Sequence, residues 1–227
     1  MSKRQENALV SIVVNIAIPA LVLMKLSGPE HLGPVGGLLA ALAFPLGYGL
    51  VDFARRREWN LVSVLGFVSV LLTGGIGLLK LDPKWIAVKE AAVPGIIGLA
   101  VLASLRTRFP IVRSLLYNDK IIRVEAVDAA LEANGNRPAF EKTLVVASWM
   151  LAGSFFLSSL LNFVLAKVLV RSPAGTVEFN AELGRMTALS YPVIVVPSML
   201  IMVATLMYLF RAIRRLTELE LEQILKG

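Results

Sequence analysis

The chain contains no cysteine and only one histidine, His31. Without cysteine it has no disulfide, no thiolate metal site and no cysteine nucleophile. A single histidine beside Glu30 lacks the convergent partners that a metal ion needs, so we expect no metal and no other cofactor. Charged residues are scarce as well, at 17% of the chain against about 25% in an average soluble domain.

Motifs of nucleotide-binding and hydrolytic enzymes are also missing. The sequence has no P-loop, no G-x-S-x-G, no H-E-x-x-H and no G-x-G-x-x-G after a strand. "TGGIG" at 73–77 resembles part of a nucleotide loop but lies in an apolar stretch. No two groups have the spacing of a nucleophile and its base, so we expect that the protein is not an enzyme.

Long apolar stretches dominate what is present. Hydrophobic residues make up 56% of the 227 residues, and the mean hydropathy is +0.73. A membrane-spanning helix needs about 20 apolar residues. The sequence therefore predicts an all-α, polytopic membrane protein with a single integral membrane domain over residues 1–227. Its six predicted spans are roughly 8–27, 33–54, 60–80, 85–105, 143–167 and 189–210.

Basic residues predict the orientation of these spans. Sixteen of the 23 lysine and arginine residues lie in the N-terminal segment, the turn at 55–59, the loop at 106–142 and the C-terminal segment. The positive-inside rule therefore predicts that both termini are cytoplasmic. The net charge of +7 is then mainly a topology signal, and no nucleic-acid partner is expected.

The loop at 106–142 is the only long polar segment. Val124, Val127 and Leu131 recur at helical spacing among charged residues, and "NGNRP" at 134–138 ends the pattern. We expect a cytoplasmic amphipathic helix between spans 4 and 5. Upstream, Arg106, Arg108 and Arg113 alternate with apolar residues, which suits anionic lipid headgroups. The loop is then a connector resting on the headgroups or a surface that binds a partner.

Asp52 lies three and four residues before the basic run Arg55–Arg57, so on a helix these side chains share a face. An ion pair where the helix leaves the membrane is the simpler interpretation. Alternatively, Asp52 lines a cytoplasmic vestibule with Asn60 and Ser63 at the start of the next span.

Lys89 and Glu90 fall just inside the fourth span, and Glu90 lies four residues before Pro94. Lys89 can extend back to water along its stem, whereas Glu90 is too short and must face the bundle interior or a cavity. Neighbouring helical residues point about 100° apart, so we expect the partner of Glu90 on another helix. Pro94 also frees the Glu90 carbonyl, which leaves a structural pair or a transport site as the alternatives.

The pattern of a polar residue four before a proline recurs in the first span, at Asn15 and Pro19. Kinked helices at matching positions are typical of transporters with inverted repeats, and Glu90, Lys89 and Asn15 would form the polar site of such a repeat. Gly74, Gly75 and Gly77 in the third span are small enough for close helix packing or for leaving space beside a substrate.

The stretch at 73–89, "TGGIGLLKLDPKWIAVK", carries glycine, leucine, aromatic-isoleucine and lysine positions of a known pattern, at Gly74, Gly75, Leu78, Trp85, Ile86 and Lys89. It resembles the intracellular septation protein A family of small multi-pass proteins of the bacterial inner membrane. Weaker similarity extends to Trp149, Phe156, Asn162, Asn180 and Gly184. Thr73 stands where that family has an aromatic residue, Gly77 where it has threonine and Ala87 where it has lysine, so the chain looks like a distant relative or a sister family.

The resemblance implies an inner-membrane protein with a role in septation, envelope synthesis or membrane homeostasis. Two classes of function remain open. In the first, a non-enzymatic envelope component binds anionic lipids, envelope or division proteins, or a second copy of itself. In the second, a small secondary transporter or lipid translocator uses the polar site at Glu90 and Asn15.

Overall fold

The computed structural model describes residues 13–56, 61–107, 111–119 and 122–225, and the side chains of 52–56 and 61–65 are not described. Apart from one isolated bridge between Ile122 and Leu225, every regular element within these ranges is helical. The all-α prediction is confirmed. The elements are η1 (Val13–Ala17), α2 (Ile18–Lys25), α3 (Gly33–Arg56), α4 (Leu61–Leu78), α5 (Lys84–Ser104), α6 (Ile111–Leu116), α7 (Val124–Ala133), α8 (Arg137–Leu169), α9 (Val177–Ser190), η2 (Tyr191–Val195), α10 (Val196–Thr217) and α11 (Leu221–Ile224).

Four segments of the described chain are long and apolar enough to cross a membrane: Gly33–Val51, Lys84–Ser104, Arg137–Leu169 and Val177–Thr217. Two shorter apolar helices, Val13–Lys25 and Gly66–Leu78, lie where the first and third spans are predicted. The number of spans and their orientation therefore stay predictions. Helix already begins at Val177, ahead of the predicted sixth span at 189–210, and continues through η2 into α10, so the position of this span also stays a prediction.

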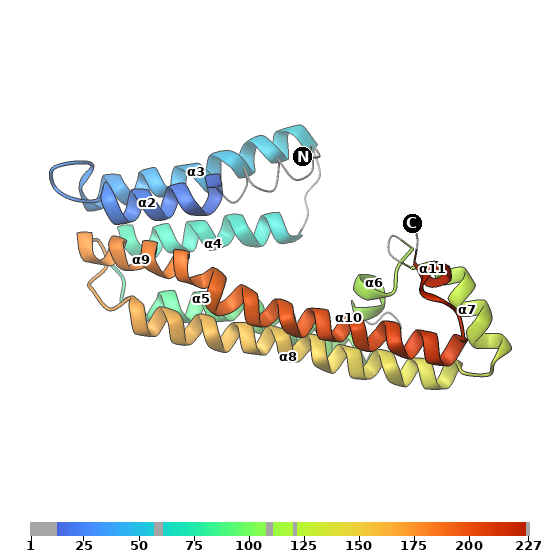
Figure 1. The fold of residues 1–227 in the computed structure, drawn as a ribbon. Helices are drawn as coiled ribbons and strands as arrows, with labels where there is room; N and C mark the ends of the chain where they lie inside the picture. Colours follow the sequence, from blue (N-terminus) through green and yellow to red (C-terminus); the bar gives the residue numbers. More distant parts are fainter. Residues whose placement is uncertain (1–12, 57–60, 108–110, 120–121, 226–227) are drawn as a thin grey trace. The chain divides into compact units, whose positions relative to one another are not determined.

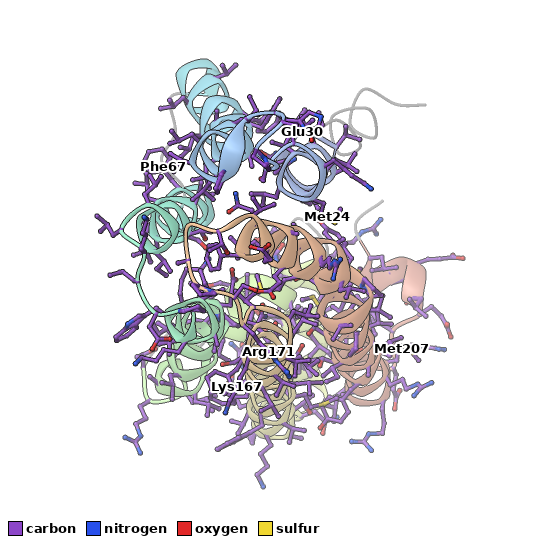
Figure 2. The ribbon with its side chains drawn as sticks, turned by 90° about the vertical axis from the view of Figure 1, so that its left-hand side faces the viewer. Met24, Glu30, Phe67, Lys167, Arg171 and Met207 are labelled. Atoms are coloured by element: carbon purple, nitrogen blue, oxygen red, sulfur yellow. The ribbon has the colours of Figure 1, made fainter. Side chains whose placement is uncertain are left out.

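The helices form two compact units, Met1–Val93 with Leu160–Ile194 and Pro94–Ser159 with Val195–Gly227. In the first unit α2 lies against both α3 and α9 (Figure 1). A Cβ on Gly184 of α9 would lie 2.8 Å from the Ala20 carbonyl oxygen, so only glycine lets these backbones approach. Figure 2 shows Met24 of α2 on the side that faces α9.

Two side chains fix the loops of the first unit. Asn180 of α9 is fully buried and donates to Ser27 Oγ at 3.0 Å and to the Pro34 carbonyl at 2.7 Å, which fastens the α2–α3 loop. Glu182 accepts three hydrogen bonds of 2.8 Å, from the N–H groups of Arg171 and Ser172 and from the Ser172 hydroxyl. These bonds hold the chain after the end of α8; Figure 2 labels Lys167 in the last turn of α8 and Arg171 just beyond it.

Prolines are accommodated in two ways. Pro19 is the second residue of α2 and follows the π-helical turn η1, and α10 begins in the same way, directly after η2. A wide π turn absorbs the backbone bond that a proline cannot make. Pro94 instead lies inside the continuous helix α5. The backbone at Pro94 therefore differs from that at Pro19, contrary to the matching expected of an inverted repeat.

The second unit carries a helical cap, which comprises α6, α7, α11, the first turns of α8 and the last turns of α10 (Figure 1). Its apolar core includes Val112, Tyr117, Val127, Leu131, Phe140, Ile213 and Ile224. Asn136 Nδ2 donates to the Leu216 carbonyl at 2.8 Å, and the Arg123 N–H donates to the Ile224 carbonyl at 2.8 Å. The predicted amphipathic helix is α7, and it is part of a packed subdomain.

Candidate functional site

The loop between α4 and α5 determines where α5 begins. The Lys84 N–H donates to Asp82 Oδ1 at 2.9 Å, and the Lys84 ammonium lies 2.9 Å from Asp82 Oδ2. These contacts, the backbone hydrogen bond first, hold the pKa of the Asp82 carboxyl below its usual value. Since α5 starts at Lys84, Lys89 falls in its second turn.

Lys89 lies between α4 and α5 with only 7% of its side chain exposed. Its Nζ donates to Thr73 Oγ1 at 2.8 Å and to Ser69 Oγ at 3.1 Å. Ser69 and Thr73 are four residues apart on α4, so their hydroxyls lie on one face of that helix. The Thr73 hydroxyl in turn donates to the Ser69 carbonyl at 3.1 Å. Lys89 is therefore turned inward, and the prediction that it extends to water is wrong.

Glu90 completes this group, since its Oε1 lies 2.7 Å from Lys89 Nζ and its side chain is 26% exposed. The prediction that Lys89 cannot be the partner of Glu90 is wrong. The two Cβ atoms do point about 100° apart, but the four-carbon stem of lysine carries its ammonium around the helix surface. We call Ser69, Thr73, Lys89 and Glu90 the Lys89 cluster.

The Lys89 cluster is closed, in that each N–H donor of the Lys89 ammonium has an acceptor within the protein. An ammonium has three N–H donors, and Thr73, Ser69 and Glu90 supply three acceptors. In a membrane, where water cannot replace a missing partner, such internal satisfaction is required. The cluster ties α4 to α5 and neutralises its own charge.

The other predicted polar residues lie on other elements or outside the described side chains. Asn15 lies half-buried in η1, and the described contacts of Lys89 and Glu90 come from α4 and α5 alone. Asp52 belongs to α3, but its side chain is not described, and Asn60 lies outside the described residues. The vestibule formed by Asp52 and Asn60 stays a prediction.

The three glycines of α4 have different surroundings. A Cβ on Gly74 would lie 2.7 Å from Leu42 Cδ1, and one on Gly77 would overlap Leu38 Cδ2, so α4 approaches α3 closely at both positions. At Gly75 a Cβ would meet no described atom within 4 Å. The expectation of close contact therefore does not fit Gly75.

A second group of charges lies in the cap. Tyr117 donates to Asp128 Oδ1 at 3.1 Å, and Arg137 Nη1 lies 3.3 Å from the same oxygen and 3.3 Å from Glu132 Oε1. Burial, with the Asp128 charge as a second cause, raises the pKa of the Tyr117 phenol. We call Tyr117, Asp128, Glu132 and Arg137 the cap cluster. It joins α7 to the end of α6 and the start of α8.

The three arginines predicted to bind lipid headgroups or a partner differ in their surroundings. Arg106 is exposed, and Arg108 lies outside the described residues. Arg113 of α6 is half-buried, with Nη1 3.6 Å from Glu141 Oε1 and its guanidinium carbon 5.9 Å from the centre of the Tyr117 ring.

Several of these partners were missed from the sequence. Ser69 and Thr73 carry a signal, two hydroxyls four residues apart in an apolar helix. Asp128 is one of the charged residues between Val124 and Leu131, and that pattern gives no signal of its contacts with Tyr117 and Arg137. No group of three or more histidine or acidic residues able to hold a metal occurs within the part of the chain that is described.

The apolar helices and the internally satisfied charges define a multi-pass helical protein of the bacterial inner membrane. Over 102 residues the chain is 40% identical to "Inner membrane-spanning protein YciB" of Nitrosococcus oceani. The match covers 44% of this chain and 48% of that relative, so the chain spans about half the length of the curated relative it matches. No protein-family model and no solved structure matches the chain.

Proposed function

We propose that the protein is a non-enzymatic component of the cell envelope that acts by binding partners, and that its polar groups within the helices serve its structure. The closed Lys89 cluster carries the proposal. A site that binds and releases an ion needs a coordination position that can be vacated, whereas the donors of Lys89 are matched by three neighbouring acceptors.

The cap is the proposed binding surface. Most of its apolar side chains face its own core, while Arg123, just before α7, and Glu125 and Glu132 of α7 are exposed. A preformed helical surface of this kind loses little conformational freedom when a partner binds. By the positive-inside rule the cap is cytoplasmic, where it would meet division proteins, envelope-synthesis proteins or a second copy of the chain.

The biological setting is proposed from two likenesses. The chain resembles the septation protein A family at residues 73–89, and it is similar to a curated inner membrane-spanning protein. The first supports a role in septation, envelope synthesis or membrane homeostasis, and the second supports a place in the inner membrane.

Complementation of a host strain that lacks the gene tests the proposal. Lys89→Met combined with Glu90→Gln removes both charges and should complement fully, because no charge needs to move. Ala126→Arg with Ala129→Arg places two cations on the exposed side of α7 and should fail while the protein is inserted at normal levels. Glu30→Lys, an exposed change outside the cap, serves as control. If the protein with Lys89→Met and Glu90→Gln is stable but fails to complement, the proposal is overturned in favour of transport.

A further inference from the structure

A hollow of about 320 Å³ lies in the second unit, at the edge of the cap. Its walls come from the segment that follows α5, from α6 and from the first turns of α8. They comprise Leu105, Thr107, Arg113, Glu141, Lys142, Leu144 and Val145.

The hollow lies at the level where both long helices change from polar to apolar. The apolar run that begins in α5 ends at Leu105, just past the end of the helix, and Arg106 follows it. In α8 the order is reversed, since Lys142 is the last charged residue before the apolar run that contains Leu144 and Val145. In a membrane this change of polarity falls at the boundary between headgroups and acyl chains.

The charges of the hollow favour an anion. Arg113 is paired with Glu141 over 3.6 Å, and both side chains are partly exposed, at 33% and 47%. Lys142 is exposed and has no ion-pair partner among the described side chains. Two cations and one carboxylate leave one net positive charge. Below them the wall is apolar, and Val145 is 44% exposed.

We propose that this hollow binds one anionic phospholipid. Lys142 and Arg113 contact the phosphate, and an acyl chain runs down past Val145 and Leu105. The combination of a cationic rim and an apolar wall distinguishes this ligand from a soluble anion, which would have no use for the wall. The site deepens the proposed function, because it names one class of partner.

The test measures lipid binding to the full-length protein in neutral detergent by native mass spectrometry. Phosphatidylglycerol, zwitterionic phosphatidylcholine and inorganic phosphate are the three probes. Lys142→Gln should weaken phosphatidylglycerol binding about fivefold, the effect of one basic residue next to an anionic surface. Glu141→Gln should strengthen it by a similar factor, since it removes the competing carboxylate. Arg215→Gln, an exposed arginine of the same unit that does not line the hollow, should leave it unchanged.

Opposite responses of Lys142→Gln and Glu141→Gln, with preference for phosphatidylglycerol over phosphatidylcholine, support the site. Equal binding of both lipids, displacement of the lipid by inorganic phosphate, or an equal loss for Arg215→Gln would overturn it. Complementation by the cap variants is a separate readout, so failure of the lipid site and failure of the proposed function are distinguishable.

Discussion

The Lys89 cluster and the cap cluster join the same kinds of groups in different surroundings. In the first unit, a lysine with 7% of its side chain exposed is held by a neighbouring carboxylate and two hydroxyls of another helix. In the second, Arg137 is 38% exposed and shares two carboxylates, one of which, Glu132, is 71% exposed. Water can replace a lost partner in the cap but hardly at Lys89.

The difference explains how each cluster is built. Within an apolar helix pair every donor needs an acceptor from the protein, so hydroxyls four residues apart are recruited. In the cap an arginine can leave some of its five donors to solvent. The loss of an ion-pair partner should therefore lower the free energy of unfolding most where the pair is least exposed to solvent.

Glu90→Gln should have the largest effect. It removes the negative charge 2.7 Å from Lys89 Nζ and leaves a buried ammonium with hydroxyl partners alone. Breaking a buried ion pair from one side costs about 3 kcal/mol or more. Thermal melting of the purified protein in detergent should show a clear fall in melting temperature.

Lys89→Met is the matched second change, because it removes the stranded charge and keeps a side chain of similar length. In the Glu90→Gln background it should restore most of the lost stability. If Glu90→Gln melts like the wild type, or if the second change fails to rescue it, the ion pair does not stabilise the Lys89 cluster.

Asp128→Asn should have an intermediate effect. The amide keeps an acceptor for Tyr117 but loses the charge that faces Arg137 over 3.3 Å. Because Asp128 is 28% exposed, solvent screening limits the loss to about 1 kcal/mol. Hydrogen exchange of the Val127 and Leu131 amides reports it, because both residues are buried in the cap core.

Glu132→Gln provides the control for the cap, since this carboxylate faces the same arginine at the same distance but is far more exposed. It should change protection little, and less still in about 1 M salt, where charges are screened beyond about 3 Å. Equal effects of the two substitutions would remove the distinction between enclosed and exposed pairs within the cap.

Much of the fold follows from local signals. "NGNRP" correctly marks the boundary between α7, which ends at Ala133, and α8, which begins at Arg137, and Gly135 has a φ of +65° that suits glycine. Helix α9 was missed because Glu178, Glu182 and Arg185 lower the hydropathy of a segment that is helical all the same. Its N-cap signal was present, since Thr176 accepts from the Phe179 N–H at 3.2 Å.

The site was only partly predictable. Lys89 and Glu90 stand out because charges are rare in apolar helices, but the direction of a Cβ does not determine where a long lysine side chain ends. The partnership with Ser69 and Thr73 depends on which faces of α4 and α5 meet, and hydropathy alone carries no such information. For the same reason, the sequence does not tell that Gly74 packs closely against α3 and that Gly75 does not.

Thr73→Val should have the smallest effect and tests whether the hydroxyls matter. It keeps the shape of the side chain and removes the acceptor 2.8 Å from Lys89 Nζ, at a position where the resembled family has an aromatic residue. Hydrogen bonds between membrane helices contribute about 0.6 kcal/mol on average, so melting should shift slightly but measurably. Thr187→Val is the matched control, because Thr187 is also half-buried in the first unit but donates only to the Leu183 carbonyl of its own helix. If both variants melt alike, the Thr73 hydroxyl contributes nothing to holding Lys89. A larger shift for Thr73→Val in the wild type than in the Lys89→Met background would show that the hydroxyl acts through the ammonium.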